Sequence, residues 1–167
     1  MTLFDECIRV ILRNEGGYQA NPNDSGNWVG GYKTGKLVGT KYGIAGKFFP
    51  NVDIKNLTEE GAKQIYYTYY WKPMNLEGIG NELAVLHIFD HGVNAGKGTA
   101  IRMAQRIVGV KADGVCGSIT TKAINGSWDF VRSYIEERKD YYKKVSLRGD
   151  NKVFLSGWLR RIDKTAF

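Results

Sequence analysis

The sequence predicts a mainly α fold with one glycine-rich region of loops and a short hairpin near the N-terminus. Apolar residues recur at helical spacing in most of the chain. Residues 18–50 differ, because they combine many glycines with Pro22 and with Asn, Asp and Ser residues that favour turns. A chain of 167 residues fits one domain and buries roughly 70% of its unfolded surface, so it needs no disulfide or metal to build a core.

The first helix is predicted over residues 4–14. Thr2 and Asp5 form an N-cap pattern, and apolar residues then follow at helical spacing. Gly16-Gly17 ends the helix, because consecutive glycines are a strong C-terminal signal. Glu15 therefore lies where the helix meets the glycine-rich region.

Helices resume at Thr58, which caps a predicted helix over residues 59–71 that Pro73 ends. Residues 82–93 are apolar on several faces, which predicts a buried central helix. Further helices are expected at residues 99–108, from Ser118, from a cap at Ser127 to about 145, and at residues 154–162. We predict one compact unit over residues 1–167, with a first part at 1–93 and a second helical part at 94–167.

Charge and composition limit the classes of function that fit the sequence, but they do not identify one. The net charge is +7 and the pI is about 9.4, which favours an acidic partner. The excess is concentrated between Arg132 and Lys164, although a solvated helix face explains it equally well. Cys7 and Cys116 lie far apart, so two buried free thiols are favoured over a disulfide. The chain has no apolar run long enough to span a membrane, and residues 1–13 lack the apolar centre of a secretory signal.

Glu15 is the strongest candidate for a catalytic acid. A helix C-terminus carries partial negative charge, and nearby apolar surface is poorly solvated, so both favour the protonated carboxyl that a general acid needs. Gly16 and Gly17 leave room for a long polymer to approach. A solvated helix end is the alternative interpretation of the same residues.

Asp24 and Thr40 are candidates for the other reacting groups. Asp24 lies in a turn-like Asn-Asp-Ser-Gly segment, where a carboxylate stays ionised and could activate water or stabilise positive charge on a sugar. Glycoside hydrolysis requires two carboxyls in different environments. Thr40 carries a hydroxyl that could position a water. Asp24 is also a natural turn former, so a purely structural role is the alternative.

These motifs resemble those of the family 108 glycoside hydrolases, which are N-acetylmuramidases. The resemblance covers most of the chain in matching order. It rests on Glu15-Gly16-Gly17-Tyr18, Asp24-Ser25-Gly26, Thr40-Lys41-Tyr42-Gly43-Ile44, Tyr70-Trp71-Lys72-Pro73, residues 87–96, Gln105, Gly109, Ala112-Asp113-Gly114 and Gly117. The last four are similar to the peptidoglycan-domain half of that family.

The resemblance implies a lysozyme-like helical fold that cleaves the bond between N-acetylmuramic acid and N-acetylglucosamine, with Glu15 as the essential acid. The Glu-to-Asp spacing is also similar to that of bacteriophage-type lysozymes, in which Asp24 and Thr40 would match the second and third catalytic members. The segment between Asp24 and Thr40 is longer than the family usually has. Thr34 is therefore a rival of Thr40.

Four residues are expected to contact substrate. Tyr18 and Tyr42 would offer aromatic faces near the cleft, whereas most of the aromatic residues between 66 and 71 are expected in the core. Asp90 lies in the apolar central helix and must have a partner if it is buried, so we expect it either to cap the turn at Asn94 or to line the cleft with Asn94.

His87 and His91 share one helix face, but the Glu of the His-Glu-x-x-His pattern and an obvious third ligand are missing. Core or cleft histidines are therefore favoured over a zinc site. We expect neither a metal nor an organic cofactor.

The predicted function is that of an endolysin-like, monomeric N-acetylmuramidase acting on peptidoglycan glycan strands, without nucleic-acid binding or stable membrane insertion. Lacking a signal peptide, it is expected to be made in the cytoplasm and to act on the cell wall after release. The alternative is a non-enzymatic wall-binding or secretion-assisting protein. Nucleic-acid binding ranks lower, because no nucleic-acid motif accompanies the charge.

Overall fold

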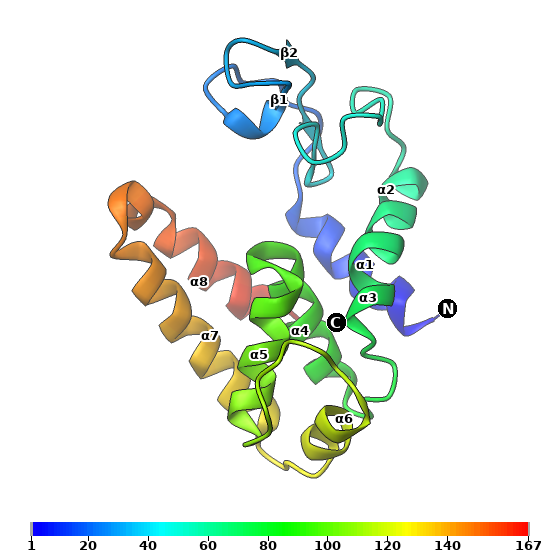
Figure 1. The fold of residues 1–167 in the computed structure, drawn as a ribbon, viewed down its shortest axis with the longest axis vertical. Coiled ribbons are helices and arrows are strands. Elements are labelled where there is room, and N and C mark those ends of the chain that lie inside the picture. The colour runs from blue at the N-terminus through cyan, green and yellow to red at the C-terminus, as the bar shows by residue number, and fades with distance from the viewer. Residues whose placement is uncertain (1, 167) are drawn as a thin grey trace. The chain divides into compact units, whose positions relative to one another are not determined.

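The computed structural model describes residues 2–166 and confirms a mainly α fold with short strands near the N-terminus (Figure 1). Its helices are α1 (Leu3–Asn14), α2 (Glu59–Tyr66), α3 (Lys72–Met74), α4 (Glu82–Ala95), α5 (Lys97–Ile107), α6 (Ser118–Asn125), α7 (Phe130–Ser146) and α8 (Leu155–Lys164). Short 3-10 helices cover Ser25–Asn27 and Gly149–Phe154, and a π-helix covers Tyr67–Trp71. The strands are β1 (Trp28–Val29), β2 (Lys36–Leu37), β3 (Thr40–Lys41) and β4 (Ile44–Ala45).

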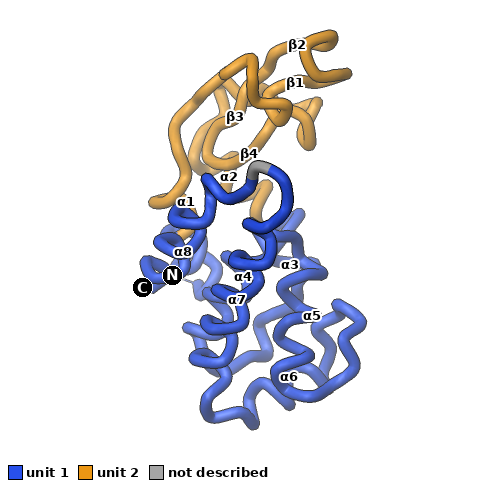
Figure 2. The backbone as a smooth tube through the Cα atoms, turned by 90° about the vertical axis from the view of Figure 1, so that its left-hand side faces the viewer, with its two compact units in different colours: residues 1–10, 67–167 blue, residues 11–66 orange. Residues whose placement is uncertain are grey.

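The chain divides into two compact units, coloured separately in Figure 2. Unit 1 holds residues 1–10 and 67–167, and unit 2 holds residues 11–66. Residue 93, after which the sequence predicts the second helical part to begin, lies in α4 of unit 1. Helix α4 packs against α5 and α7, so the segments on both sides of this residue contribute to the core of unit 1.

Helix α4 is the centre of unit 1, as its apolar sequence predicts. Every residue from 84 to 92 is buried. Phe89 packs edge-on against Trp71 with ring centroids 5.0 Å apart, and Phe4 lies 5.4 Å from the same indole. Full burial of one such side chain contributes about 1.5–3 kcal/mol. This aromatic cluster therefore fixes the first turn of α1 against α4.

The predicted helix over residues 59–71 changes geometry before it reaches Pro73. It is α-helical to Tyr66 and continues as a π-helix and then as the short α3. In an α-helix the N–H of residue 73 would donate to the Tyr69 carbonyl, but Pro73 has no N–H. The Lys97 Nζ donates to this carbonyl oxygen at 2.6 Å instead. The altered helix leaves Tyr67 and Tyr69 exposed while Tyr66 and Trp71 are buried. The prediction that most of these aromatic residues lie in the core thus holds for only some of them.

Unit 2 contains two antiparallel hairpins between α1 and α2. Strand β1 pairs with β2, and β3 pairs with β4. The second hairpin turns at Tyr42 and Gly43, whose φ angles are 51° and 74°. Two positive φ angles are what a two-residue type I′ turn requires, and glycine adopts them without steric cost. The predicted glycine-rich region is therefore built from hairpins that bring distant loop residues together.

Both cysteines are buried and free, in agreement with the sequence-based expectation. Burial, followed by the charges of Glu6 and Glu82, raises the pKa of the Cys7 thiol to about 12. A thiol with so high a pKa stays protonated and is a poor nucleophile. Within residues 2–166, none of the helices combines the length and the apolar character needed to cross a bilayer.

Candidate active site

Glu15 is the first residue after α1. Its backbone N–H donates to the Leu12 carbonyl at 3.2 Å, which completes the last turn of the helix. The side chain is partly buried within unit 2. The end of α1 thus holds this carboxyl at the surface of the unit without releasing it fully into solvent.

The Glu15 carboxyl lies against the turn of the β3–β4 hairpin. A Cβ added at Gly43 would lie 2.8 Å from Glu15 Oε2 and 2.5 Å from the Tyr66 hydroxyl oxygen. The Tyr66 hydroxyl donates to the Tyr42 carbonyl at 2.9 Å, which anchors α2 to the same turn. A carboxyl and a phenol oxygen therefore share the space that a side chain at position 43 would occupy. Neither Gly43 nor Tyr66 is among the site residues predicted from the sequence.

The backbone after Glu15 is open on its outer side. A Cβ added at Gly16 or at Gly17 would meet no atom within 4 Å. Both glycines are exposed. The space in front of Glu15 can therefore admit a ligand close to the main chain, as the sequence predicts.

The segment after these glycines pairs with β3. Gln19 N–H donates to the Thr40 carbonyl at 2.9 Å, and Thr40 N–H donates to the Gln19 carbonyl at 2.8 Å. Tyr42 N–H also donates to the Gly16 carbonyl at 3.1 Å. This ladder places Thr40 beside the chain that leaves Glu15.

A network of side-chain hydrogen bonds connects Thr40 with Asp24. The Thr40 hydroxyl donates to Asn27 Oδ1 at 2.7 Å, and Asn27 Nδ2 donates to Gln19 Oε1 at 2.8 Å. Gln19 Nε2 in turn donates to Asp24 Oδ2 at 3.2 Å. The other Asp24 oxygen accepts from the Gly26 N–H at 2.8 Å. Asn27 is completely buried, so this amide fixes both predicted residues in place.

The long segment between Asp24 and Thr40 folds back on itself. It forms the β1–β2 hairpin, and the N–H groups of Val38 and Gly39 donate to the Asn27 carbonyl at 2.7 and 3.1 Å. The hairpin therefore starts directly after Asn27, and the residues that follow β2 return to hydrogen-bond with the Asn27 carbonyl. Thr34 lies exposed between β1 and β2, whereas Thr40 belongs to the network that holds Asp24.

Comparison with known proteins shows the family of this chain. Residues 8–96, more than half of the chain, match the family described as Glycosyl hydrolase 108. This chain belongs to the glycosyl hydrolase 108 family. Residues 99–163 match the family described as Predicted Peptidoglycan domain. This glycosyl hydrolase 108 protein is therefore a glycoside hydrolase that acts on peptidoglycan.

A solved structure of SagA from Brucella abortus is similar to this glycosyl hydrolase 108 chain, with a TM-score of 0.74 and 26% sequence identity. The similarity covers 97% of this chain and 90% of SagA. No curated protein sequence matches the chain significantly. The mainly α, lysozyme-like architecture predicted from the sequence is thus shared with a solved relative along nearly its whole length.

Two tyrosines predicted to contact substrate belong to unit 2 of the glycosyl hydrolase 108 chain. Tyr18 is 40% exposed, and its hydroxyl donates to the Val38 carbonyl at 3.1 Å. Its ring also borders a hollow of about 390 Å³ that includes Lys36 and Lys55. Tyr42 is partly buried at the hairpin turn, with the Lys41 ammonium 5.4 Å from its ring centroid. Both tyrosines lie on the paired segments in which Gln19 bonds to Thr40 and Gly16 bonds to Tyr42.

Asp90 and Asn94 belong to unit 1. Asp90 is fully buried, and its carboxylate accepts hydrogen bonds from Arg138 and Arg161. Burial opposes its ionisation, but these two cations hold the pKa of Asp90 below its usual value. These contacts are those of a structural ion pair rather than of a group that lines a cleft. Asn94 is exposed near the end of α4.

The two histidines of α4 are core residues. His91 Nδ1 lies 2.9 Å from the Tyr134 hydroxyl, which itself donates to the Ala100 carbonyl at 3.1 Å. The tyrosine hydrogen is thereby used, so His91 must be the donor through Nδ1–H. Among the side chains that the structure describes, no group of three or more His, Cys, Asp or Glu is placed to share a metal ion.

Proposed function

We propose that this glycosyl hydrolase is an N-acetylmuramidase that hydrolyses the bond between N-acetylmuramic acid and N-acetylglucosamine in peptidoglycan. The observation that carries the proposal is the position of Glu15. Its carboxyl is held against Gly43 and beside the Tyr66 hydroxyl, while the glycines that follow it are open to solvent. A polymer can therefore bring a glycosidic oxygen to a carboxyl that the fold holds in place.

In the proposed reaction, Glu15 donates its proton to the glycosidic oxygen as the bond from that oxygen to the anomeric carbon breaks. The positive charge that develops on the sugar ring is stabilised by Asp24, whose orientation is fixed by Gly26 and Gln19. Water then adds to the anomeric carbon and gives its proton to the Asp24 carboxylate, and proton exchange with solvent restores the Glu15 acid. Because the Thr40 hydroxyl hydrogen is already donated to Asn27, its oxygen acts as an acceptor that can orient this water.

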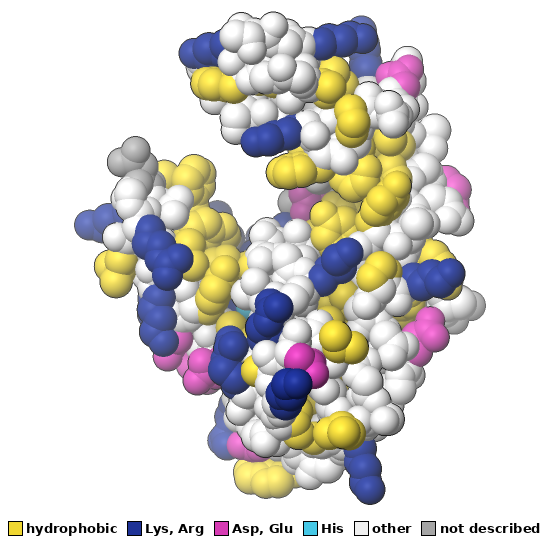
Figure 3. Space-filling model, in the orientation of Figure 1, with side chains coloured by type: hydrophobic (Ala, Val, Ile, Leu, Met, Phe, Trp, Pro, Cys, Tyr) yellow, Lys and Arg dark blue, Asp and Glu magenta, His cyan; other side chains and the backbone are white. Residues whose placement is uncertain are grey.

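The surface charge supports a wall polymer as the partner. A net charge of +7 attracts the acidic groups of a bacterial cell wall. On the face shown in Figure 3, Lys and Arg side chains are spread among apolar and acidic ones instead of forming one basic stripe. This face therefore lacks the continuous basic surface that nucleic-acid binding uses. The proposal therefore places the site of action in the cell wall, in an endolysin-like role.

The decisive experiment replaces Glu15 with Gln and measures reducing sugar released from purified sacculi. We expect a loss of at least about 100-fold, as for removal of a general acid. Glu60→Gln is the matched control, because Glu60 lies on α2 of the same unit with a side chain 81% exposed, and it should retain the parent rate. An E15Q protein that remains folded and releases sugar as fast as the parent would contradict the assignment.

Mass spectrometry of the digested glycan tests which bond is cut. N-acetylmuramic acid at the new reducing end supports the muramidase assignment, and N-acetylglucosamine at that end contradicts it. The rival interpretation, a non-enzymatic wall-binding protein, predicts that the parent pellets with sacculi but releases no reducing sugar at any concentration.

A further inference from the structure

Trp128 is an exposed aromatic residue that the proposed reaction does not use. Its side chain is 89% accessible, the most exposed of the large apolar residues described. It lies in the short connection between α6 and α7 of unit 1. Leaving an indole in water forgoes a favourable burial of about 2 kcal/mol, and aromatic residues exposed in this way often mark binding surfaces.

Local hydrogen bonds keep Trp128 outside α7. The sequence predicts that Ser127 caps this helix, but α7 begins only at Phe130. The Ser127 hydroxyl instead donates to Asp129 Oδ1 at 3.4 Å. The Arg132 guanidinium lies 5.7 Å from the indole centroid and pairs with Asp129 at 3.4 Å. The indole is therefore supported by its neighbours while most of its surface remains accessible.

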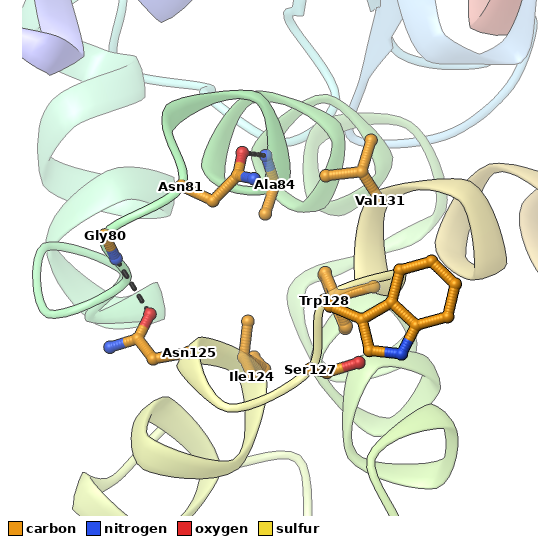
Figure 4. Close-up of a pocket in the computed structure, with 9 residues that line it drawn as sticks. Gly80, Asn81, Ala84, Ile124, Asn125, Ser127, Trp128 and Val131 are labelled. Carbon is orange, nitrogen blue, oxygen red and sulfur yellow. Dashed lines mark hydrogen bonds between the residues drawn. The ribbon is translucent and has the colours of Figure 1, made fainter.

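Two hollows border this indole and share Asn81, Trp128 and Val131 as lining residues. Their volumes are about 420 and 510 Å³, within the range of small-molecule sites. Figure 4 shows the first hollow, which is enclosed by the start of α4, the end of α6 and the start of α7. Its walls combine two amide side chains with apolar ones, namely Asn81, Asn125, Ala84, Ile124, Phe130 and Val131.

The amides are fixed by the backbone. Asn125 accepts from the Gly80 N–H at 2.8 Å and donates to the Gly78 carbonyl at 2.9 Å. Asn81 Oδ1 accepts from the Ala84 N–H at 3.1 Å, as the N-cap of α4. Among residues 2–166, the Asn81 Nδ2 group has no hydrogen-bond partner. It is therefore an oriented donor at the edge of the hollow (Figure 4).

The charges around the hollows indicate the class of ligand. Arg132 is the one cation among the residues that line them, and it is accompanied by Asp129 and Glu136. Such a lining does not attract phosphates, which disfavours nucleic acids and anionic lipid headgroups. A neutral ligand with an apolar ring face and an amide acceptor matches an indole beside an amide donor.

We propose that Trp128 and Asn81 form a binding site for N-acetylated amino sugars of a glycan strand, on unit 1 of the protein. A pyranose ring stacks on the Trp128 indole, the acetamido oxygen accepts from Asn81 Nδ2, and the acetamido methyl contacts Ala84 and Ile124. The proposal rests on the proposed function for its substrate class. It agrees with the match of residues 99–163, which include Trp128, to a peptidoglycan domain.

Binding is tested without catalysis, using the full chain and soluble oligosaccharides. Chitotetraose carries acetamido groups and cellotetraose does not, so the parent should bind the first at least about tenfold more tightly, as followed by NMR shifts of the Trp128 indole N–H. Trp128→Ala should weaken chitotetraose binding about tenfold or more, as measured by isothermal titration calorimetry of parent and variant, because it removes the stacking surface. Phe154→Ala is the control, since Phe154 is 56% exposed and lines neither hollow.

Asn81→Asp separates the donor from the helix cap. Aspartate still accepts from the Ala84 N–H, so α4 keeps its N-cap, but the amide donor is lost. Chitotetraose affinity should fall severalfold, whereas the weak cellotetraose affinity and the thermal midpoint should not change. Equal chitotetraose affinities of the parent, W128A and N81D would overturn the proposal. So would W128A-sensitive binding to phospholipid vesicles, with no binding of chitotetraose.

These outcomes are distinct from those that test Glu15. If the parent cleaves no sacculi yet W128A loses chitotetraose binding, the proposed activity fails and the sugar site stands. If E15Q abolishes cleavage while W128A binds chitotetraose as the parent does, the proposed activity stands and the proposed sugar site fails.

Discussion

The carboxyl of Glu15 occupies the space into which a side chain at position 43 would extend. Gly43 has a φ of 74°, and a Cβ at this position would lie within 3 Å of both Glu15 and Tyr66. Glycine is required here for two reasons, its left-handed backbone and the space it leaves. Gly17 has neither constraint, because its Cβ position is empty.

These two glycines give a matched pair of variants. Gly43→Ala should lower the free energy of unfolding by about 2 kcal/mol, since it combines backbone strain with a steric clash, and it should reduce sugar release by displacing Glu15. Gly17→Ala should leave the thermal midpoint nearly unchanged. Thermal unfolding and the reducing-sugar assay measure the two effects. A G43A protein with parental stability and rate would show that the turn does not position Glu15.

The sequence indicated Glu15 because helix ends and paired glycines are local signals. It could not indicate Tyr66, because the contact of this residue with Gly43 depends on α2 returning to the hairpin turn. It placed Asp90 in a buried helix and required a partner for it, but the partners Arg138 and Arg161 lie 48 and 71 residues away. Residue types and local spacing carry no information on such long-range pairing.

At the scale of elements, the β1–β2 hairpin explains how a longer chain between Asp24 and Thr40 keeps the two residues linked. The extra residues form their own hairpin and return to Asn27. Insertions of this kind are tolerated because closing a longer loop costs little additional entropy. The length difference that made Thr34 a rival of Thr40 in the sequence is therefore absorbed locally.

Asn27 is the residue on which this linkage depends. Asn27→Ala should cost about 1–3 kcal/mol in the free energy of unfolding, because it removes a fully buried amide together with its hydrogen bonds to Gln19 and Thr40. The thermal midpoint should fall by several degrees. Sugar release should also fall at temperatures where the variant is fully folded.

Asn23→Ala is the control for this variant, because Asn23 is an exposed amide of the same loop. Its thermal midpoint and rate should match those of the parent. If N27A unfolds at the parental temperature, the buried amide network does not stabilise the hairpins.

The helix boundaries show which features of the helices could be predicted from the sequence and which could not. The apolar spacing located α1, α4 and α8 closely, since each buries one regular stripe or a continuous apolar run. It placed the N-cap of α7 two residues too early, at Ser127 instead of Asp129, because Ser127 is a good N-cap in isolation. The contact of Ser127 with Asp129 prevails instead, and it exposes Trp128.

At the scale of the whole molecule, the buried polar groups of unit 1 make its stability depend on pH. His87 and His91 are at most 2% exposed. Burial, reinforced by the charge of Arg138, lowers the pKa of His87 to about 4 and that of His91 to about 3. Both are therefore neutral in the folded protein at pH 5, whereas histidines of an unfolded chain, with a pKa near 6.5, are largely protonated.

Lowering the pH should therefore destabilise the fold at pH values well above those at which carboxylates titrate. Below about pH 6.5 the unfolded state binds protons that the folded state does not, so the free energy of unfolding falls as the pH falls. The slope approaches about 1.4 kcal/mol per pH unit for each histidine until the folded-state values near 4 and 3 are reached. The pKa of Asp90 is also lowered, so its ion pair contributes to this loss only below its usual pKa of 3.8.

Urea unfolding at pH 7.5 and at pH 5 measures the difference in the free energy of unfolding, and His87→Gln should reduce this difference by about half. Equal stability at the two pH values, or protonation of the folded histidines near pH 6.5 in an NMR titration of the parent, would show that α4 does not bury neutral imidazoles.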